Sequence, residues 1–310
     1  MLKSIWVAVL FLCTNFSIHN AFATESDNKS SKRNIETKTI DSKSIDNQAV
    51  PPVTDKEKSE KIADLIEEQS QSISEASNQL FGTDPANKFS LYQPTYFIFG
   101  KDNLKLQFSA KYRVAKNYNL YLAFTQVMFW NIYEQSAPFD DINYNPEAFY
   151  RFFEHENNFL RSIDLGTMHT SNGEDGEKSR SINRVYLKTN IATTIGRHSL
   201  LGELKLQQTY SKDSLNEDIV DHIGYWDLKM IITHLLVWGT TRLDIEYRIF
   251  AGKDLINIGQ GGRELGLLYN LGSENFNPTF YVQYYSGYAE SLLHYNEKVS
   301  VVRGGLLLYF

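Results

Sequence analysis

The 310-residue sequence predicts an all-β fold, a membrane-spanning antiparallel β-barrel of about twelve strands that runs up and down around a lumen. Segments of about ten residues alternate polar and apolar side chains over the last two thirds of the chain. The polar linkers between them alternate long and short, as the outer loops and inner turns of a barrel do. No apolar run after the N-terminal segment approaches the roughly 20 residues of a membrane helix.

Residues 1–23 carry the features of a secretory signal peptide. Lys3 supplies the positive charge, and residues 5–12 form an apolar run that is too short to span a membrane. Residues 21–23 read Ala-Phe-Ala, a small-residue cleavage site. Cys13 is the only cysteine and lies inside this segment, so we expect no disulfide in the mature protein.

Residues 24–87 differ in composition from the rest of the chain, because they are rich in Ser, Lys, Asp, Glu, Asn and Gln and almost free of aromatic side chains. This composition predicts a mostly disordered tail. Apolar residues between 62 and 80 fall near helical spacing, which predicts a short amphipathic helix within the tail. The acidic pair at 67–68 favours a solvated helix over one bound to an anionic membrane.

Residues 88–310 form the predicted barrel, and most of the 19 Tyr and 19 Phe residues fall there. The clearest strand is 237–250, where the apolar residues 243, 245, 247 and 249 alternate with the charged residues 242, 244, 246 and 248. A soluble sandwich rarely directs four such charges to one face, whereas a membrane barrel directs them into its lumen. The alternating segments, about twelve in all, span residues 89–99, 103–114, 118–130, 146–154, 160–170, 180–192, 197–210, 222–234, 237–250, 260–271, 278–289 and 298–310.

The linkers and the end of the chain give the barrel a direction. The long linkers are 131–145, 211–221 and 252–259, and the short ones include 115–117 and 193–196. An even number of strands places both termini on the periplasmic side. The chain ends on Phe310, with Leu306 and Leu308 on the same face, which is typical of the last strand of an outer-membrane barrel. We therefore expect the outer-membrane assembly machinery to be a partner, through Phe310.

The side chains predicted to point into the lumen carry charges of both signs. Opposite charges can pair across a narrow lumen, so we expect a packed interior rather than an open pore. These residues include Arg113, Lys205, Lys229, Arg242, Asp244, Glu246, Glu264 and Arg303.

The stretch 169–183 contains the most plausible chemistry. Ser171 comes two positions after His169, so both lie on one face of a strand with β-carbons roughly 6–7 Å apart. A return strand can place Asn183 beside His169, where its amide oxygen would fix the imidazole tautomer. This is the nucleophile, base and orienting group of a serine hydrolase. On spacing alone the pattern is weak, since a His and a Ser two apart in a strand are usually structural.

The face on which these residues lie strengthens the interpretation. Ile163 and Leu165 share the parity of His169, and Val185 and Leu187 share the parity of Asn183. The polar trio therefore lies on the apolar face, which in a membrane barrel faces lipid. A hydrolytic site there would meet acyl chains directly, near the outer leaflet.

The chain resembles the outer-membrane phospholipase A family over roughly residues 89–310. Residues 169–173 read HTSNG and residues 179–184 read SRSINR, which match the family pattern H-x-S-N-G followed by S-R-S-x-N-R with the same spacing. Further matching stretches are FTQ at 124–126, SAPF at 136–139, NYNP at 143–146, ELGL at 264–267 and YSGYAESLLHYN at 285–296.

The resemblance implies a role for each matching position. Ser171 would be the nucleophile, His169 the general base and Asn183 the residue that orients it. Calcium, Ca²⁺, would lie beside the oxyanion, held by the Ser179 hydroxyl and the main-chain carbonyl of Glu174. The family completes this site with a carbonyl from a second subunit, at the position of Ser136.

The resemblance also implies that a homodimer is the active form. Gln126 matches a polar residue buried in the family's membrane-embedded dimer interface, so dimerisation would complete the calcium site and activate the enzyme. Position 174 departs from the family, which often has a basic residue there. A main-chain ligand tolerates the change, and the Glu174 carboxylate would affect calcium affinity or headgroup preference.

The resemblance implies a calcium-dependent phospholipase of the bacterial outer membrane. Its substrates would be membrane phospholipids, cleaved at the sn-1 and sn-2 acyl esters of glycerophospholipids and lysophospholipids. A metal ion facing the oxyanion stabilises charge in place of backbone donors, and hard oxygen ligands suit calcium. The alternatives are a non-enzymatic barrel, either a small porin or an adhesin, and a lipid A deacylase. No nucleic-acid partner is expected.

Overall fold

The computed structural model describes residues 88–308, apart from 116, 156–157, 240, 254 and 272–277. The predicted signal peptide, the predicted tail and Phe310 lie outside these residues. None of the helices in the described part of the chain has the length and apolar character needed to cross a membrane.

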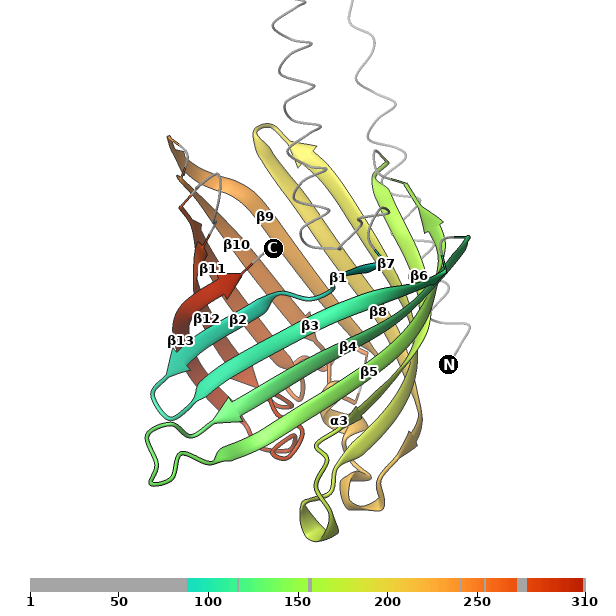
Figure 1. Cartoon of the computed structure of the whole chain (residues 1–310), viewed down its shortest axis with the longest axis vertical. Helices are drawn as coiled ribbons and strands as arrows, with labels where there is room; N and C mark the ends of the chain where they lie inside the picture. The colour runs from blue at the N-terminus through green and yellow to red at the C-terminus, as the bar shows by residue number, and fades with distance from the viewer. Residues whose placement is uncertain are drawn as a thin grey trace, which may run out of the picture. The chain divides into compact units, whose positions relative to one another are not determined.

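Twelve long antiparallel strands, β2 to β13, form a closed barrel (Figure 1). Each strand pairs with the next one in sequence, and β13 pairs with β2 to close the wall. The short strand β1 adds a second pairing to β3. The strands are β1 Phe89–Leu91, β2 Thr95–Gly100, β3 Leu104–Ala115, β4 Tyr118–Trp130, β5 Phe139–Glu154, β6 Leu160–Ser171, β7 Ser181–Ile195, β8 His198–Lys212, β9 Trp226–Trp238, β10 Thr241–Phe250, β11 Gly262–Asn270, β12 Pro278–Gly287 and β13 Val299–Leu308.

The structure confirms the predicted barrel and divides its first strand in two. The segment predicted at 89–99 forms β1 and β2 around an interruption at Pro94. Proline has no N–H to give to a ladder, and here the Gln107 side chain donates to the Pro94 carbonyl over 2.7 Å. Tyr92 lies in the interruption, and its ring stacks on Phe149 at 5.6 Å inside the barrel.

Other strand boundaries also differ from the prediction. Residues 139–145, predicted as a loop, begin β5, where the Phe139 ring stacks on Trp130 at 5.3 Å. The strand predicted at 222–234 begins four residues later, because the short helix α3 Val220–Ile223 takes up its first residues. Residues 237–238 end β9 rather than opening β10. Gly239 has φ 60° in the turn between these strands, a backbone conformation that glycine adopts without strain.

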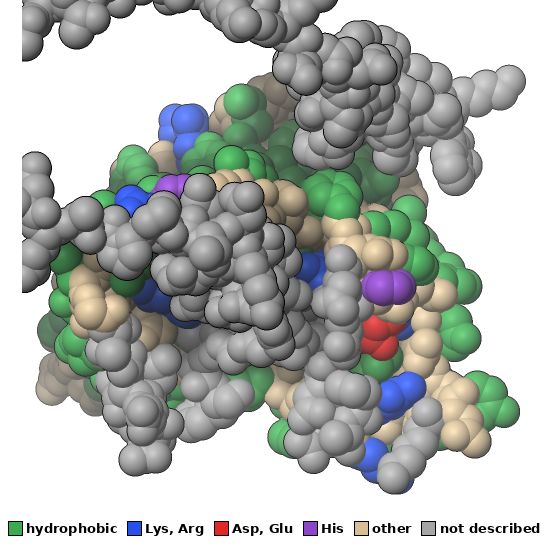
Figure 2. All heavy atoms as spheres, turned by 90° about the horizontal axis from the view of Figure 1, so that it is seen from above, with side chains coloured by type: hydrophobic (Ala, Val, Ile, Leu, Met, Phe, Trp, Pro, Cys, Tyr) green, Lys and Arg blue, Asp and Glu red, His purple; other side chains and the backbone are tan. Residues whose placement is uncertain are grey.

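The two faces of the wall differ as the alternation predicts. On β12, Val282 and Tyr284 are 44% and 40% exposed, whereas Tyr281 and Gln283 between them are buried. Figure 2 views the wall from above and shows hydrophobic side chains around much of its rim. The outward face is therefore apolar and the lumen polar, which is the arrangement of a barrel in a membrane.

Several of the charges in the lumen are paired. Lys229 bonds Glu246 at 3.0 Å, and Arg242 bonds Asp244 at 3.0 Å. Arg151 meets Asp164 through two bonds of 2.7 and 3.1 Å, and both side chains are almost fully buried. These pairs occupy part of the interior, as expected for a packed lumen rather than an open pore.

The long loops lie at one end of the barrel, which also carries the short turn 101–103 between β2 and β3. The long loops span residues 131–138, 172–180, 213–225, 251–261 and 288–298, and the 213–225 loop contains α3 at the lower end in Figure 1. The 288–298 loop folds back over the lumen. The backbone N–H groups of Leu292 and Leu293 donate to Asp141 Oδ2 over 2.8 and 2.9 Å, which ties this loop to β5.

The alternation of faces makes a labelling prediction. Val282→Cys should react with a maleimide supplied in the lipid phase, whereas Gln283→Cys should not, because the two neighbouring positions face lipid and lumen. The measurement is labelling of each folded single-cysteine variant in liposomes, on a mature chain that is expected to have no other thiol. Equal labelling at both positions, or lipid-phase labelling of cysteines at 242 or 244, would contradict the assignment of faces.

Candidate active site

Strands β6 and β7 bring His169 and Asn183 side by side. The two residues are register partners across the antiparallel pair, and Ser171 faces Ser181 two positions along. His169 Nδ1 lies 2.8 Å from Asn183 Oδ1. An amide oxygen only accepts hydrogen bonds, so Nδ1 carries the proton and Nε2 is left free to act as a base.

All three residues lie on the outward face of the wall. On the same face of the same strands, Leu165 is 48% exposed and Val185 44% exposed, while Met168 and Ile182 on the opposite face are buried. His169, Ser171 and Asn183 are themselves partly exposed. The site thus opens toward the lipid phase, at the strand ends that carry the long loops.

Asn172 organises the loop that follows Ser171. Its side-chain nitrogen donates to the Lys178 carbonyl over 2.8 Å, and its oxygen accepts from the Arg180 N–H over 3.0 Å. Gly173 has φ 72°, and a β-carbon there would meet the Tyr144 ring at 2.9 Å. Glycine is therefore required at this position by both backbone and space, which gives the Asn-Gly pair of the motif a structural reason.

Ser179 is joined to a carboxylate that the sequence did not reveal. Its hydroxyl donates to Asp213 Oδ2 over 2.9 Å, and Asp213 caps the 3₁₀ turn Ser214–Asn216 by accepting from the Leu215 N–H. The hydrogen bond from the Leu215 N–H has the larger effect and that from the Ser179 hydroxyl the next, and together they hold the pKa of Asp213 below its usual value. The only signal in the sequence was an Asp-Ser pair of helix-capping type at the start of the 213–225 loop.

These oxygens have the chemistry of a calcium site. Ser179 offers a hydroxyl, Asp213 a carboxylate, and Glu174 is an exposed residue in the same loop as Ser179. Calcium prefers such hard oxygen ligands and tolerates irregular geometry. Within the described ranges, no three or more His, Cys, Asp or Glu side chains cluster in a way that could hold a metal. The residues present fit a site built from mixed oxygens.

Gln126 lies on β4, and Ser136 lies in the loop that follows this strand. Ser136 is exposed with φ 68°, and among the described residues no hydrogen bond joins it to Ser179. Gln126 lies on the outward face of β4, where it pairs with Tyr144, and Tyr144 in turn pairs with Ser171. A row of cross-strand neighbours therefore leads along the outer wall from Gln126 to Ser171.

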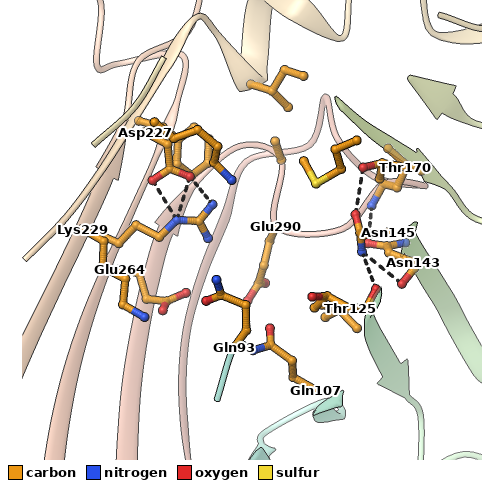
Figure 3. A pocket seen from close by; sticks show the side chains of 18 of the residues that line it. Gln93, Gln107, Thr125, Asn143, Asn145, Thr170, Asp227, Lys229, Glu264 and Glu290 are labelled. Atoms are coloured by element: carbon orange, nitrogen blue, oxygen red, sulfur yellow. Dashed lines mark hydrogen bonds and ion pairs between the residues drawn. The ribbon is translucent and has the colours of Figure 1, made fainter. Parts of the chain in front are cut away.

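Behind the site the lumen contains a polar cavity of about 270 Å³ (Figure 3). Thr170 and Asn145 line it on the side of β5 and β6, opposite Asp227 and Lys229 on β9. Thr170 separates His169 from Ser171 in the chain, so the same strand presents its reactive pair outward and a polar side chain inward.

The sequence and the fold both match known proteins. Residues 70–308 match the family model described as phospholipase A1. The phospholipase A1 of Escherichia coli K12 is 34% identical over 218 residues, which cover 67% of this chain and 70% of that protein. A putative phospholipase A1 of Neisseria meningitidis serogroup B is 28% identical over 225 residues, covering 66% of this chain and 53% of that protein.

Solved structures agree. A crystal structure of the Salmonella typhi outer membrane phospholipase dimer with bound calcium superposes with a TM-score of 0.60 at 28% identity, covering 76% of this chain and 96% of that one. The outer membrane phospholipase A of Escherichia coli superposes with a TM-score of 0.59 at 28% identity, covering 71% of this chain and 94% of that one. The chain therefore belongs to the phospholipase A1 family: it is a β-barrel of the outer membrane and a phospholipase.

Proposed function

We propose that this protein is a calcium-dependent phospholipase that hydrolyses the sn-1 and sn-2 acyl esters of glycerophospholipids and lysophospholipids. Ser171 is the nucleophile, His169 the general base and Asn183 the residue that orients the imidazole. The 2.8 Å contact between His169 Nδ1 and Asn183 Oδ1, on the lipid-facing wall and beside Ser171, carries the proposal. Family membership favours this function over a small porin, an adhesin or a lipid A deacylase.

Each of the three residues has a defined task. His169 Nε2 accepts the proton of the Ser171 hydroxyl as its oxygen attacks the ester carbonyl, and then returns the proton to the leaving alcohol. Asn183 holds Nδ1–H, which keeps the imidazole in the tautomer with a basic Nε2. An amide balances the imidazolium charge less than a carboxylate would, so more of the stabilisation must act at the oxyanion.

Calcium supplies that stabilisation when it is bound, as a positive charge facing the developing oxyanion. Ser179, through its hydroxyl, and Glu174, through its main-chain carbonyl, would hold the ion. Asp213, already hydrogen-bonded to Ser179, would add a carboxylate oxygen. Ser136 would supply the carbonyl from a second subunit, because it lies in a different loop and is exposed.

A homodimer fits the row of neighbours on the outer wall. Gln126 would lie in the interface, and adjacent strands are about 4.8 Å apart, so two strand spacings separate it from Ser171. An interface centred on Gln126 would therefore reach the nucleophile. A partner wall placed there would enclose the acyl chain and exclude lipid from the reacting ester.

The test is release of free fatty acid from phospholipid in detergent, with and without a calcium chelator. We expect release in calcium and its loss on chelation, with recovery when calcium is added back. Undiminished release in chelator would remove calcium from the proposal, and no release under any condition would contradict the assignment as a whole.

Two substitutions separate the metal from the dimer. Ser179→Ala removes a calcium ligand, so it should raise the calcium needed for half-maximal activity about tenfold and weaken association in parallel, because an ion bound between subunits favours the dimer. Gln126→Leu should weaken association and leave the calcium requirement of the remaining dimer unchanged. Sedimentation across a calcium titration, beside the activity assay, measures both. A fully active monomer would contradict the model.

The ends of the chain carry separate proposals. Residues 1–23 direct export and are removed, residues 24–87 form a tail outside the catalytic unit, and the assembly machinery of the outer membrane recognises Phe310. Deletion of 24–87 should change neither fatty-acid release nor association.

A further inference from the structure

The hydrogen-bond ladder that supports the catalytic strand is interrupted where the reactive residues stand. Between β5 and β6 the paired positions pass from Tyr144–Ser171 to Glu147–Met168 and skip the two between them. The register places Pro146 opposite His169, and a proline has no N–H to donate. On the other side, the pairing of β7 with β8 shifts between Asn183 and Arg184, a bulge that re-aims the side chains around it.

Side chains in the lumen bridge both irregularities. Thr170, whose side chain points inward between His169 and Ser171, donates to Asn145 Oδ1 over 2.8 Å. Arg184 follows Asn183 in the chain, and its guanidinium donates to Thr170 Oγ1 over 2.9 Å and to Gln207 Oε1 over 3.0 Å.

Asn145 and Gln207, at the two ends of this series of hydrogen bonds, anchor it to the barrel wall. Asn145 donates to the Thr125 carbonyl of β4 over 3.0 Å, and Gln207 donates to the carbonyls of Ile223 and Gly224 at the end of α3. Figure 3 shows Thr170 and Asn145 joined in this way beside the cavity. A continuous chain of bonds thus runs from β4 to β8. We call Asn145, Thr170, Arg184 and Gln207 the lumen brace.

We propose that the lumen brace is a positioning device, which sets the distance of Ser171 from His169 and the alignment of Asn183 from the opposite face of the wall. The inference rests on the proposed roles of those three residues. All four brace residues line the lumen cavity, on the face of the wall opposite the reactive side chains. They act through the backbone: Thr170 is flanked by the base and the nucleophile, and Arg184 by the orienting residue. A shift of about 1 Å in such a geometry costs as much as 100-fold in rate.

Thr170→Val is the sharpest probe, because it keeps the shape and the β-branch and removes only the hydroxyl that links Asn145 to Arg184. We expect kcat to fall about 10- to 100-fold while KM, the calcium requirement and association stay within about twofold. The rate at which a small sulfonyl fluoride labels Ser171 should fall by a similar factor, since this reports the nucleophile without lipid binding. Thr170→Ser, which restores the hydroxyl, should recover most of both rates.

Thr279→Val is the matched control. Thr279 is a threonine of β12 that is 1% exposed, and its hydroxyl makes no hydrogen bond within the described part of the chain. The Thr279→Val substitution should leave kcat and the rate of Ser171 labelling unchanged. Folding of every variant is checked by heat-dependent migration of the barrel, and Arg184→Gln repeats the test from β7 should Thr170→Val not fold.

The outcomes separate this inference from the proposed function. Ser171→Ala without loss of activity would overturn the catalytic assignment itself. An inactive Ser171→Ala together with wild-type kcat and labelling in folded Thr170→Val would overturn the lumen brace alone. A change confined to KM, or failure of Thr170→Ser to recover the rates, would also contradict it.

Discussion

Replacing Ser171 with alanine is expected to abolish ester hydrolysis while the barrel still folds. Removing a nucleophile or its base from a serine hydrolase lowers kcat by roughly four to six orders of magnitude, so His169→Ala should be equally severe. Asn183→Ala should leave residual activity, because the hydrogen bond to Nδ1 orients the base without taking part in bond formation. Fatty-acid release by the purified variants in calcium measures all three.

The folded state of these variants is the necessary control. None of the three side chains belongs to the buried lumen, so unfolding in urea should occur within about 1 kcal/mol of the parent. Turnover by Ser171→Ala at the parent rate would show that another group attacks the ester.

The largest effect on stability is expected from Asp164. Its carboxylate is fully buried, meets Arg151 through two hydrogen bonds and lies 3.7 Å from Lys188 on the next strand. Asp164→Ala would leave two cations in a confined lumen with less compensation, so the free energy of unfolding should fall by about 3–5 kcal/mol. Reversible urea unfolding in liposomes measures the difference.

An exposed ion pair provides the comparison. Asp221 and Lys253 meet at 3.3 Å in the long loops, where the Lys253 side chain is 62% exposed. Asp221→Ala should cost less than about 1 kcal/mol, because solvent screens the pair. Equal losses at 164 and 221 would contradict the view that burial makes the Asp164 pair important.

The sequence predicts most of this fold because a barrel wall repeats one simple rule. Alternation with a period of two placed Val282 and Gln283 on opposite faces, and the same parity placed His169 and Asn183 on the lipid side. The prediction fails where one residue overrides the pattern. Pro94 divides the first strand, and Gly239 places a turn inside the segment predicted to be the clearest strand.

The site was less completely predictable, since its parts come from separate loops. His169, Ser171 and Asn183 could be paired because β6 and β7 form one hairpin with a fixed register. Asp213 belongs to the next loop along the barrel wall, and nothing in its neighbourhood in the sequence indicates that it reaches Ser179. The link between Thr170 and Arg184 was hidden for another reason, because both side chains lie on the face away from the chemistry.

The closure of the wall between β2 and β13 has a consequence for how the enzyme comes into being. Six register pairs, from Gly100–Arg303 to Thr95–Leu308, join the beginning of the barrel to its end. This contact spans nearly the whole of the predicted barrel segment 88–310, so its closure costs more entropy than the formation of any hairpin between neighbouring strands. A chain that stops before β13 keeps two unpaired strand edges, which are prone to aggregate in place of inserting. Completion of synthesis is thus a condition of folding, and a partial copy of this phospholipase has no finished wall on which to expose its serine to lipid.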